Sequence, residues 1–192
     1  YFLMIGIGYM FFEITLISRM VVLFDTPTLA MTVVIVSLLL SSGLGSLWLD
    51  RRLHRPRLAC RLIPLMVAGL LLLYALFLPA LIRQLLPLPD VWRVVLTALL
   101  LCPAGFLMGM PFPLGLSLAG RADRSFIPWA WCANSCASVI SASLAITLAL
   151  SWGYGRNTIA AGVAYFAAAC FMLLFHHFMA SPVIGTKATS AM

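Results

Sequence analysis

Two charged residues stand inside a hydrophobic run, residues 1–24, that is long enough to cross a bilayer. Glu13 lies in the middle of this run and Arg19 follows six residues later. Charges at membrane depth are costly and commonly mark ion or substrate pathways. On one helix these two side chains point roughly 240° apart, so they cannot pair with each other. We predict that Glu13 is either protonated or partnered by Asn134 or a second-span serine, in a proton-relay or cation site or in a structural hydrogen bond.

A proline-rich break is the second candidate site. The residues Gly109-Met110-Pro111-Phe112-Pro113 interrupt an apolar stretch. Each proline removes a backbone donor and disfavours helix at the preceding residue. Unwound backbone at membrane depth survives only where protein or a cavity protects it. We therefore predict a broken or re-entrant element around Gly109, Pro111 and Pro113, which is either a structural kink or a ligand site.

Histidine and cysteine residues suggest no cofactor. His176 and His177 lie near the end of the last hydrophobic run, where a membrane histidine can ligate haem or a pigment or meet a quinone. Their side chains point about 100° apart on a helix, and interface anchoring is the alternative. Cys132 and Cys136 could share a metal, but we expect all five cysteines to be buried apolar residues and predict no metal site. The sequence contains no Ser/His/Asp grouping or phosphate loop, and we assign no catalytic residue.

The composition places the chain in the membrane class. It is 64% hydrophobic and 9% charged, whereas soluble domains are about half apolar and about a quarter charged. A span needs roughly 20 apolar residues, so 192 residues allow about six spans and leave no room for a soluble domain. We predict an all-α polytopic transmembrane helical bundle of about six spans, with the fourth span broken. Residues 1–180 form one domain, and residues 181–192 form a polar, mobile tail.

The predicted spans follow the hydrophobic runs and the polar or proline residues between them. They are residues 1–24, 27–49, 59–80, 91–110 with an apolar extension to 119, 128–151 and 157–179. Small residues at four-residue spacing on the second and fifth spans predict two faces that pack inside the bundle. These residues are Ser37, Ser41 and Gly45, and Ala130, Asn134, Ser138 and Ala142.

The distribution of basic residues predicts the orientation. The net charge is +7, but the arginines crowd the loop after the second span and do not cover a soluble face, which argues against a nucleic-acid partner. The positive-inside rule places this loop in the cytoplasm, and the loop can also favour anionic headgroups. The cytoplasmic side then holds Arg51, Arg52, Arg55, Arg57, Arg61, Arg121, Arg124 and Lys187, and the outer side Arg83, Arg93 and Arg156. We predict a bacterial-type inner membrane protein with both termini in the cytoplasm.

Several segments together carry a family resemblance. They are Gly8-Tyr9-Met10, Glu13-Ile14, Leu16-Ile17, Arg19, Leu23-Phe24, Pro27-Thr28, Ser42-Gly43-Leu44-Gly45-Ser46, Gly109-Met110-Pro111-Phe112-Pro113-Leu114-Gly115 and Pro128-Trp129-Ala130-Trp131 with Asn134. In this order they resemble the membrane region of spermidine synthase-like proteins, which fuse helices to an S-adenosylmethionine-type Rossmann domain. Asn134-Ser135 departs from that family's Asn-Gly pattern. The Rossmann domain is not in this sequence, so the resemblance assigns no transfer reaction to these residues.

These observations lead to three hypotheses. We predict a non-catalytic membrane domain or subunit that anchors or assembles a larger protein, with the lipid bilayer and other membrane subunits or a fused soluble domain as partners. The start at Tyr1, without the features of a signal peptide, leads us to expect a segment of a longer chain. One alternative is an accessory subunit of a respiratory or photosynthetic complex. The other is a transporter-like domain for a polyamine or other cation, which requires a wet cavity joining Glu13 to Pro111.

Overall fold

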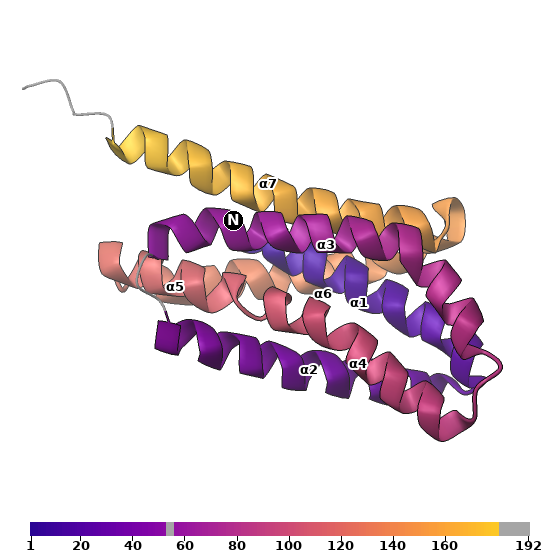
Figure 1. The fold of residues 1–192 in the computed structure, drawn as a ribbon. Coiled ribbons are helices and arrows are strands. Elements are labelled where there is room, and N and C mark those ends of the chain that lie inside the picture. Colours follow the sequence, from indigo (N-terminus) through magenta and orange to yellow (C-terminus); the bar gives the residue numbers. More distant parts are fainter. Residues whose placement is uncertain (53–55, 181–192) are drawn as a thin grey trace, which may run out of the picture.

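The chain folds into a bundle of long helices. The computed structural model describes the backbone of residues 1–52 and 56–180, and the side chains of these residues except 52, 56–57, 122 and 175–180. The predicted polar tail lies outside this part. Over the described residues the helices are α1 (Phe2–Phe24), α2 (Pro27–Arg52), α3 (Pro56–Leu85), α4 (Asp90–Met108), α5 (Pro111–Ala122), α6 (Phe126–Trp152) and α7 (Tyr154–Ala180) (Figure 1).

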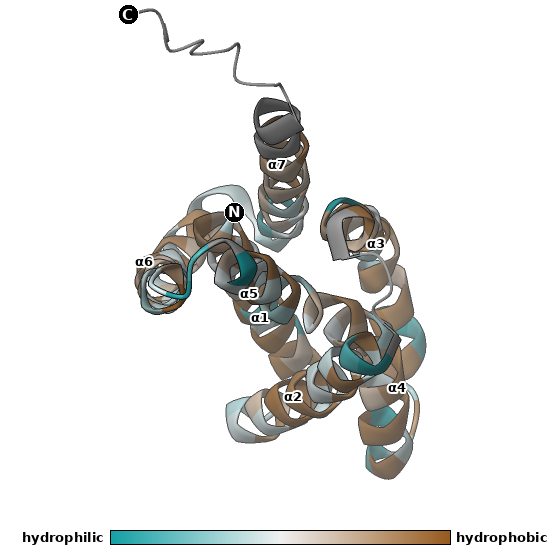
Figure 2. Cartoon of the chain, turned by 90° about the vertical axis from the view of Figure 1, so that its left-hand side faces the viewer, coloured by the Kyte–Doolittle hydropathy of each residue, from teal (hydrophilic) through white to brown (hydrophobic). Residues whose placement is uncertain are grey.

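Six segments in this part of the chain are long and apolar enough to cross a membrane, because α4 and α5 together make one, Asp90–Arg121. The predicted fold class, an all-α multi-pass membrane bundle, is confirmed. Large apolar side chains are exposed on all six of these segments, as expected of surfaces that face lipid. Figure 2 shows that hydrophobic residues predominate along the helices. Exposed tryptophan and tyrosine residues gather at both ends, as in interfacial belts. They are Trp48, Trp129 and Trp131 at one end, and Trp92, Trp152 and Tyr154 at the other.

Local chain chemistry determines the first helix boundary. Asp25 adopts a left-handed conformation with φ 56° and donates its backbone N–H to the Val21 carbonyl at 3.0 Å. Pro27 then opens α2, where a proline needs no hydrogen-bond acceptor and already has a helical φ. The stop and restart at Asp25-Thr26-Pro27 therefore lie where the sequence predicts them.

The third helix is longer than predicted. It continues to Leu85 instead of ending at residue 80, and it includes Pro64, Pro79 and Arg83. Arg83 stays in the helix because its exposed guanidinium group folds back, with Nε donating to the Pro79 carbonyl at 3.4 Å. Long basic side chains can reach the interface from the last turn of a span. The predicted polar connector is accordingly only four residues long, 86–89.

The turn between the last two helices is also shorter than predicted. Only Gly153 lies outside a helix there, with a φ of 85° that suits glycine. At the same end of the bundle, Arg93 pairs with Asp90 at 3.3 Å and donates to the carbonyls of Leu86 at 2.5 Å and Leu23 at 3.4 Å. Arg93 thus ties the α3–α4 connection to the end of α1.

Helix α1 forms the centre of the bundle. It contacts every other helix and packs most closely against α6, α7 and α2 (Figures 1 and 2). The side chains of Phe12, Leu16, Met20 and Leu23 have no exposed surface. Around this column α3 packs on α7, and α2 packs on α4. The two charged residues of α1 are therefore held by the most heavily packed helix of the fold.

Candidate functional site

Glu13 lies half-buried on α1, one helical turn after Tyr9. Within the described part of the chain it forms no hydrogen bond or ion pair. Neither Asn134 nor a serine of α2 partners it. We predicted that Glu13 is either protonated or partnered. The described residues provide no partner for it.

Asn134 instead lies against Gly6, which precedes Glu13 by seven residues on α1. A Cβ atom at Gly6 would stand 2.7 Å from the Asn134 carbonyl oxygen and 3.0 Å from both its Oδ1 and the Ser138 hydroxyl. A hydrogen at Gly6 therefore lets α6 approach the backbone of α1 closely. Seven residues of helix separate this contact from Glu13 by about 10 Å. Asn134 belongs to a helix-packing contact, as its neighbour Ser138 does.

Arg19 lies near the opposite end of α1, beside the first turn of α7. Its Nη2 atom would stand 3.7 Å from a Cβ atom at Gly155. Its Nε atom is buried and has no hydrogen-bond partner among the described residues, and no ion pair joins it to Asp25 there. Arg19 is thus separated from both Glu13 and Asn134.

The predicted break in the fourth span is present. Helix α4 ends at Met108, and Pro111 opens α5. Gly109 and Met110 between them keep right-handed helical backbone angles, so the break is a kink in the helix. Pro113 also falls in the first turn of α5, where a missing N–H leaves no hydrogen bond unmade.

Protein atoms cover this kink on two sides. A Cβ atom at Gly109 would stand 2.1 Å from the Ser42 carbonyl oxygen of α2. The Tyr1 hydroxyl donates to the Pro111 carbonyl at 2.8 Å, and Met110 is 2% exposed. The backbone N–H groups of Gly109 and Met110 donate to the carbonyls of Gly105 and Leu107, so the kink leaves neither donor unpaired. The geometry is that of a packed kink.

The break and the half-buried Glu13 lie far apart along α1. Tyr1 is fixed to Pro111 and lies twelve residues before Glu13 on α1, which corresponds to about 18 Å along the helix axis. Ile5, Phe11 and Phe12 are buried between them. The structure therefore does not bring the candidate residues together into one site.

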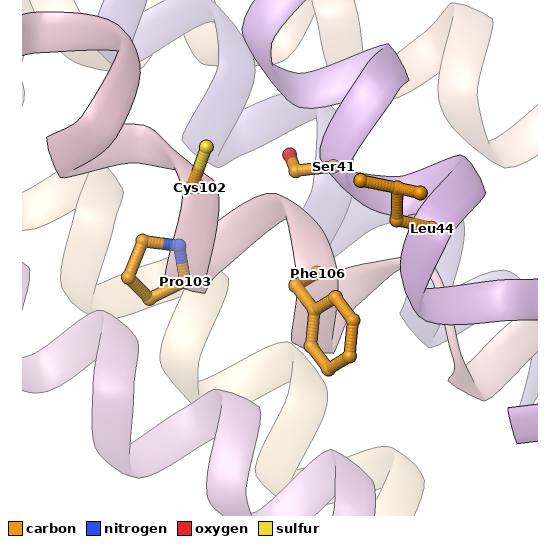
Figure 3. Close-up of a pocket in the computed structure, with 5 residues that line it drawn as sticks. All are labelled: Ser41, Leu44, Cys102, Pro103 and Phe106. Atoms are coloured by element: carbon orange, nitrogen blue, oxygen red, sulfur yellow. The ribbon is translucent and has the colours of Figure 1, made fainter. Parts of the chain in front are cut away.

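Two hollows stand out in the part of the chain that the structure describes. The first lies between α2 and α4 and measures about 260 Å³. Its lining residues are Ser41 and Leu44 on one helix, facing Cys102, Pro103 and Phe106 on the other (Figure 3). The second, of about 340 Å³, lies on α6 and is lined by Ser135, Cys136, Val139 and Ile140. Both are open and apolar, and neither is lined by Glu13 or Pro111.

The contact between α2 and α4 contains residues that sequence reasoning missed. A Cβ atom at Gly105 would stand 1.9 Å from the Ser41 hydroxyl oxygen, and one at Gly45 would stand 2.0 Å from the Phe106 carbonyl oxygen. The predicted inner face of the second span, Ser37-Ser41-Gly45, is indeed buried. The partner face on α4 could have been recognised from the four-residue spacing of Gly105 and Gly109, which is typical of close helix pairs in membranes.

The exposure of the cysteines differs from the prediction that all five are buried. Cys60 is buried, but Cys102, Cys132 and Cys136 are exposed. The expectation of burial was wrong for these three because they lie on outward faces of peripheral helices, where lipid accepts an apolar thiol as readily as protein does. His176 and His177 lie in α7, and their side chains are outside the described residues.

Comparisons with protein-family models, with curated proteins and with solved structures gave no significant match to this chain. The resemblance to spermidine synthase-like membrane regions accordingly stays a prediction from the motifs.

Proposed function

We propose that this chain is a non-catalytic integral membrane domain or subunit that anchors or assembles a larger protein. One observation carries the proposal: the polar groups at membrane depth lie at separate places in the bundle. Asn134 lies against Gly6, whereas Arg19 lies near the far end of α1. Catalysis and transport require polar groups that converge on a shared cavity. Among the three hypotheses, the dispersed arrangement therefore favours anchoring or assembly.

We also propose a relation to the membrane region of spermidine synthase-like proteins, because residues of the shared motifs take part in helix packing. Four glycines that belong to the resembling motifs lie where a Cβ atom would stand within 3 Å of a neighbouring segment. They are Gly8 against Tyr165, Gly45 against Phe106, Gly109 against Ser42 and Gly115 against Tyr1 and Phe2. Motif residues that serve helix packing support the role of a membrane region whose chemistry lies in another domain or subunit.

The proposed location is a bacterial-type inner membrane with both termini in the cytoplasm. The end of α2, the start of α3, the α5–α6 connection and the end of α7 lie at the same end of the bundle (Figure 1). This end carries Arg51, Arg61, Arg121 and Arg124. The positive-inside rule favours the cytoplasm for it.

The outer face of α6 supports a partner within the membrane. This helix is the least buried of the six candidate spans, and it exposes Trp129, Trp131, Val139, Ile140 and Leu150. Such a face suits an accessory subunit of a larger complex as well as an anchor. Transport has no comparable support, since Tyr1, which contacts Pro111, lies about 18 Å along α1 from Glu13 and buried residues of α1 lie between them.

Reconstitution tests the distinction between scaffold and transporter. The purified chain in lipid vesicles should take up no more labelled polyamine than empty vesicles do, with or without a proton gradient. The Glu13→Gln variant should behave in the same way. Uptake by the wild-type chain that Glu13→Gln abolishes would establish transport in place of anchoring.

A further inference from the structure

The hollow between α2 and α4 is open at the surface and offers no free polar group. Leu44 is 61% exposed and Cys102 is exposed as well, so the hollow opens towards lipid (Figure 3). The Ser41 hydroxyl donates to the Ser37 carbonyl of its own helix at 2.5 Å. The other lining side chains are apolar. A polar occupant would lose its hydrogen bonds there, so the hollow of about 260 Å³ suits a hydrocarbon chain.

The same face of α2 leads from the hollow to an arginine. Leu44, Trp48 and Arg51 are four and three residues apart, so their side chains are neighbours on one side of the helix. Trp48 is 51% exposed, and its ring lies 6.0 Å from that of Phe106, which lines the hollow. Arg51 lies about 10 Å beyond Leu44 along the helix axis. An exposed apolar path therefore joins the hollow to a cation.

Arg51 is exposed, and within the described residues its guanidinium group forms no hydrogen bond or ion pair. The neighbouring Asp50 is exposed too, but its side chain points about 100° away around the helix. At the opposite end of the bundle, by contrast, Arg93 pairs with Asp90 and donates to two carbonyls. As far as the described residues go, the donors of Arg51 are available to a group from outside the chain.

A phospholipid with a net negative charge matches both features. Guanidinium groups bind phosphate through paired hydrogen bonds. Exposed tryptophans such as Trp48 mark the level of the headgroups. The sequence adds positive charge at this end, with five arginines in residues 50–61 and two in residues 121–124, against Asp50 and Asp123. Basic groups of this kind attract anionic lipids. A zwitterionic lipid has the same phosphate but also a cation, which these arginines repel.

We propose that one anionic phospholipid binds along α2, with an acyl chain in the α2–α4 hollow and its phosphate at Arg51. The hollow supplies apolar contact, and Arg51 selects the headgroup. This site is independent of the anchoring role, because it needs neither a partner protein nor a soluble domain.

Native mass spectrometry of the chain in neutral detergent tests the headgroup. One phosphatidylglycerol should bind at least about fivefold more tightly than phosphatidylcholine with the same acyl chains. Excess glycerol phosphate should not displace it, because the acyl chain also holds the lipid. Both comparisons use the wild-type chain. Equal binding of the two lipids, or displacement by glycerol phosphate, would overturn the proposal.

A matched pair of variants tests the arginine. Arg51→Gln should weaken phosphatidylglycerol binding about fivefold and leave phosphatidylcholine binding unchanged. Arg124→Gln removes the same charge from the α5–α6 connection, which lies at the same end of the bundle (Figure 1), and should bind as the wild-type chain does. An equal loss in both variants would reveal a general charge effect and contradict a site at Arg51.

Fluorescence quenching locates the acyl chain. Trp48 becomes the only tryptophan after four substitutions at exposed positions, Trp92→Phe, Trp129→Phe, Trp131→Phe and Trp152→Phe. In phosphatidylcholine bilayers, a small fraction of chain-brominated phosphatidylglycerol should quench Trp48 more than the same fraction of chain-brominated phosphatidylcholine. Arg51→Gln should remove this excess. Equal quenching by the two brominated lipids would show that no anionic lipid is held beside Trp48 and would overturn the proposal.

Discussion

Gly6 on α1 lies against the backbone of Asn134 on α6, with room for a hydrogen atom but not for a methyl group. A Cβ atom there would stand 2.7 Å from the Asn134 carbonyl oxygen. The contact joins two residues that are 128 positions apart in the sequence. It also accounts for Asn134, which the sequence offered as a partner for Glu13.

Gly6→Ala should therefore loosen the α1–α6 contact. We expect a loss of about 1–3 kcal/mol in the free energy of unfolding, because the added methyl group meets a backbone oxygen that cannot move alone. Gly69→Ala on α3 is the matched control, since its Cβ atom would have nothing within 4 Å. The control should be neutral or more stable by up to about 1 kcal/mol. Equal stability of the two variants in detergent unfolding would contradict the contact.

A second pair of glycines tests the α2–α4 interface. Gly45→Ala places a Cβ atom 2.0 Å from the Phe106 carbonyl oxygen, whereas a Cβ atom at Gly43 would meet nothing within 4 Å. Gly45→Ala should lower the melting temperature in a fluorescence-detected thermal scan, and Gly43→Ala should not. If Gly43→Ala lowered it as much, the helix face assigned to this interface would be wrong.

The hydroxyl group of Tyr1 should protect the break in the fourth span. Tyr1→Phe keeps the ring contact with Phe2, whose centroid is 5.4 Å away, but removes the 2.8 Å hydrogen bond to the Pro111 carbonyl. We expect a cost of about 1 kcal/mol and faster amide exchange at Met110 and Leu114. Tyr154→Phe, at a partly exposed tyrosine on α7, is the control and should leave that exchange unchanged. Unchanged exchange in Tyr1→Phe would show that the bond does not hold the break.

One exposed loop should respond to pH. The Ser125 backbone N–H donates to Asp123 Oδ1 at 2.9 Å, and this bond, together with the Ser125 hydroxyl, holds the pKa of the carboxyl below its usual range. A lowered folded pKa contributes stability above the unfolded value of about 3.9, and this contribution is lost as the pH falls through the folded pKa.

Ser125→Ala should raise the pKa of Asp123 only part of the way, because the backbone donor remains. Carboxyl carbon chemical shifts recorded across an acid titration measure the change. The assignment fails if the wild-type Asp123 titrates at or above the ordinary value for aspartate.

Features that depend on the local chain were predictable from the sequence. Asp25-Thr26-Pro27 and the prolines after Gly109 act on their own backbone, so the turn and the break lie where the sequence predicts them. Features that depend on which helix face meets a neighbour were predictable only in part, since the inner face Ser37-Ser41-Gly45 is buried as predicted but three of the cysteines are not. Cys132 was expected inside because a thiol is apolar, yet it lies outside, about 200° around α6 from Ala130 on the predicted inner face. The extension of α3 past residue 80 was missed because Arg83 can reach the interface without leaving the helix.

Isolation of the chain from its native membrane tests the anchoring role most directly. The chain would be captured in mild detergent, its intact mass would be measured and its companions identified. The account predicts either a polypeptide well above the 20.9 kDa of this sequence that carries a soluble domain, or stoichiometric partner proteins. A lone chain of 20.9 kDa without stoichiometric companions would contradict it.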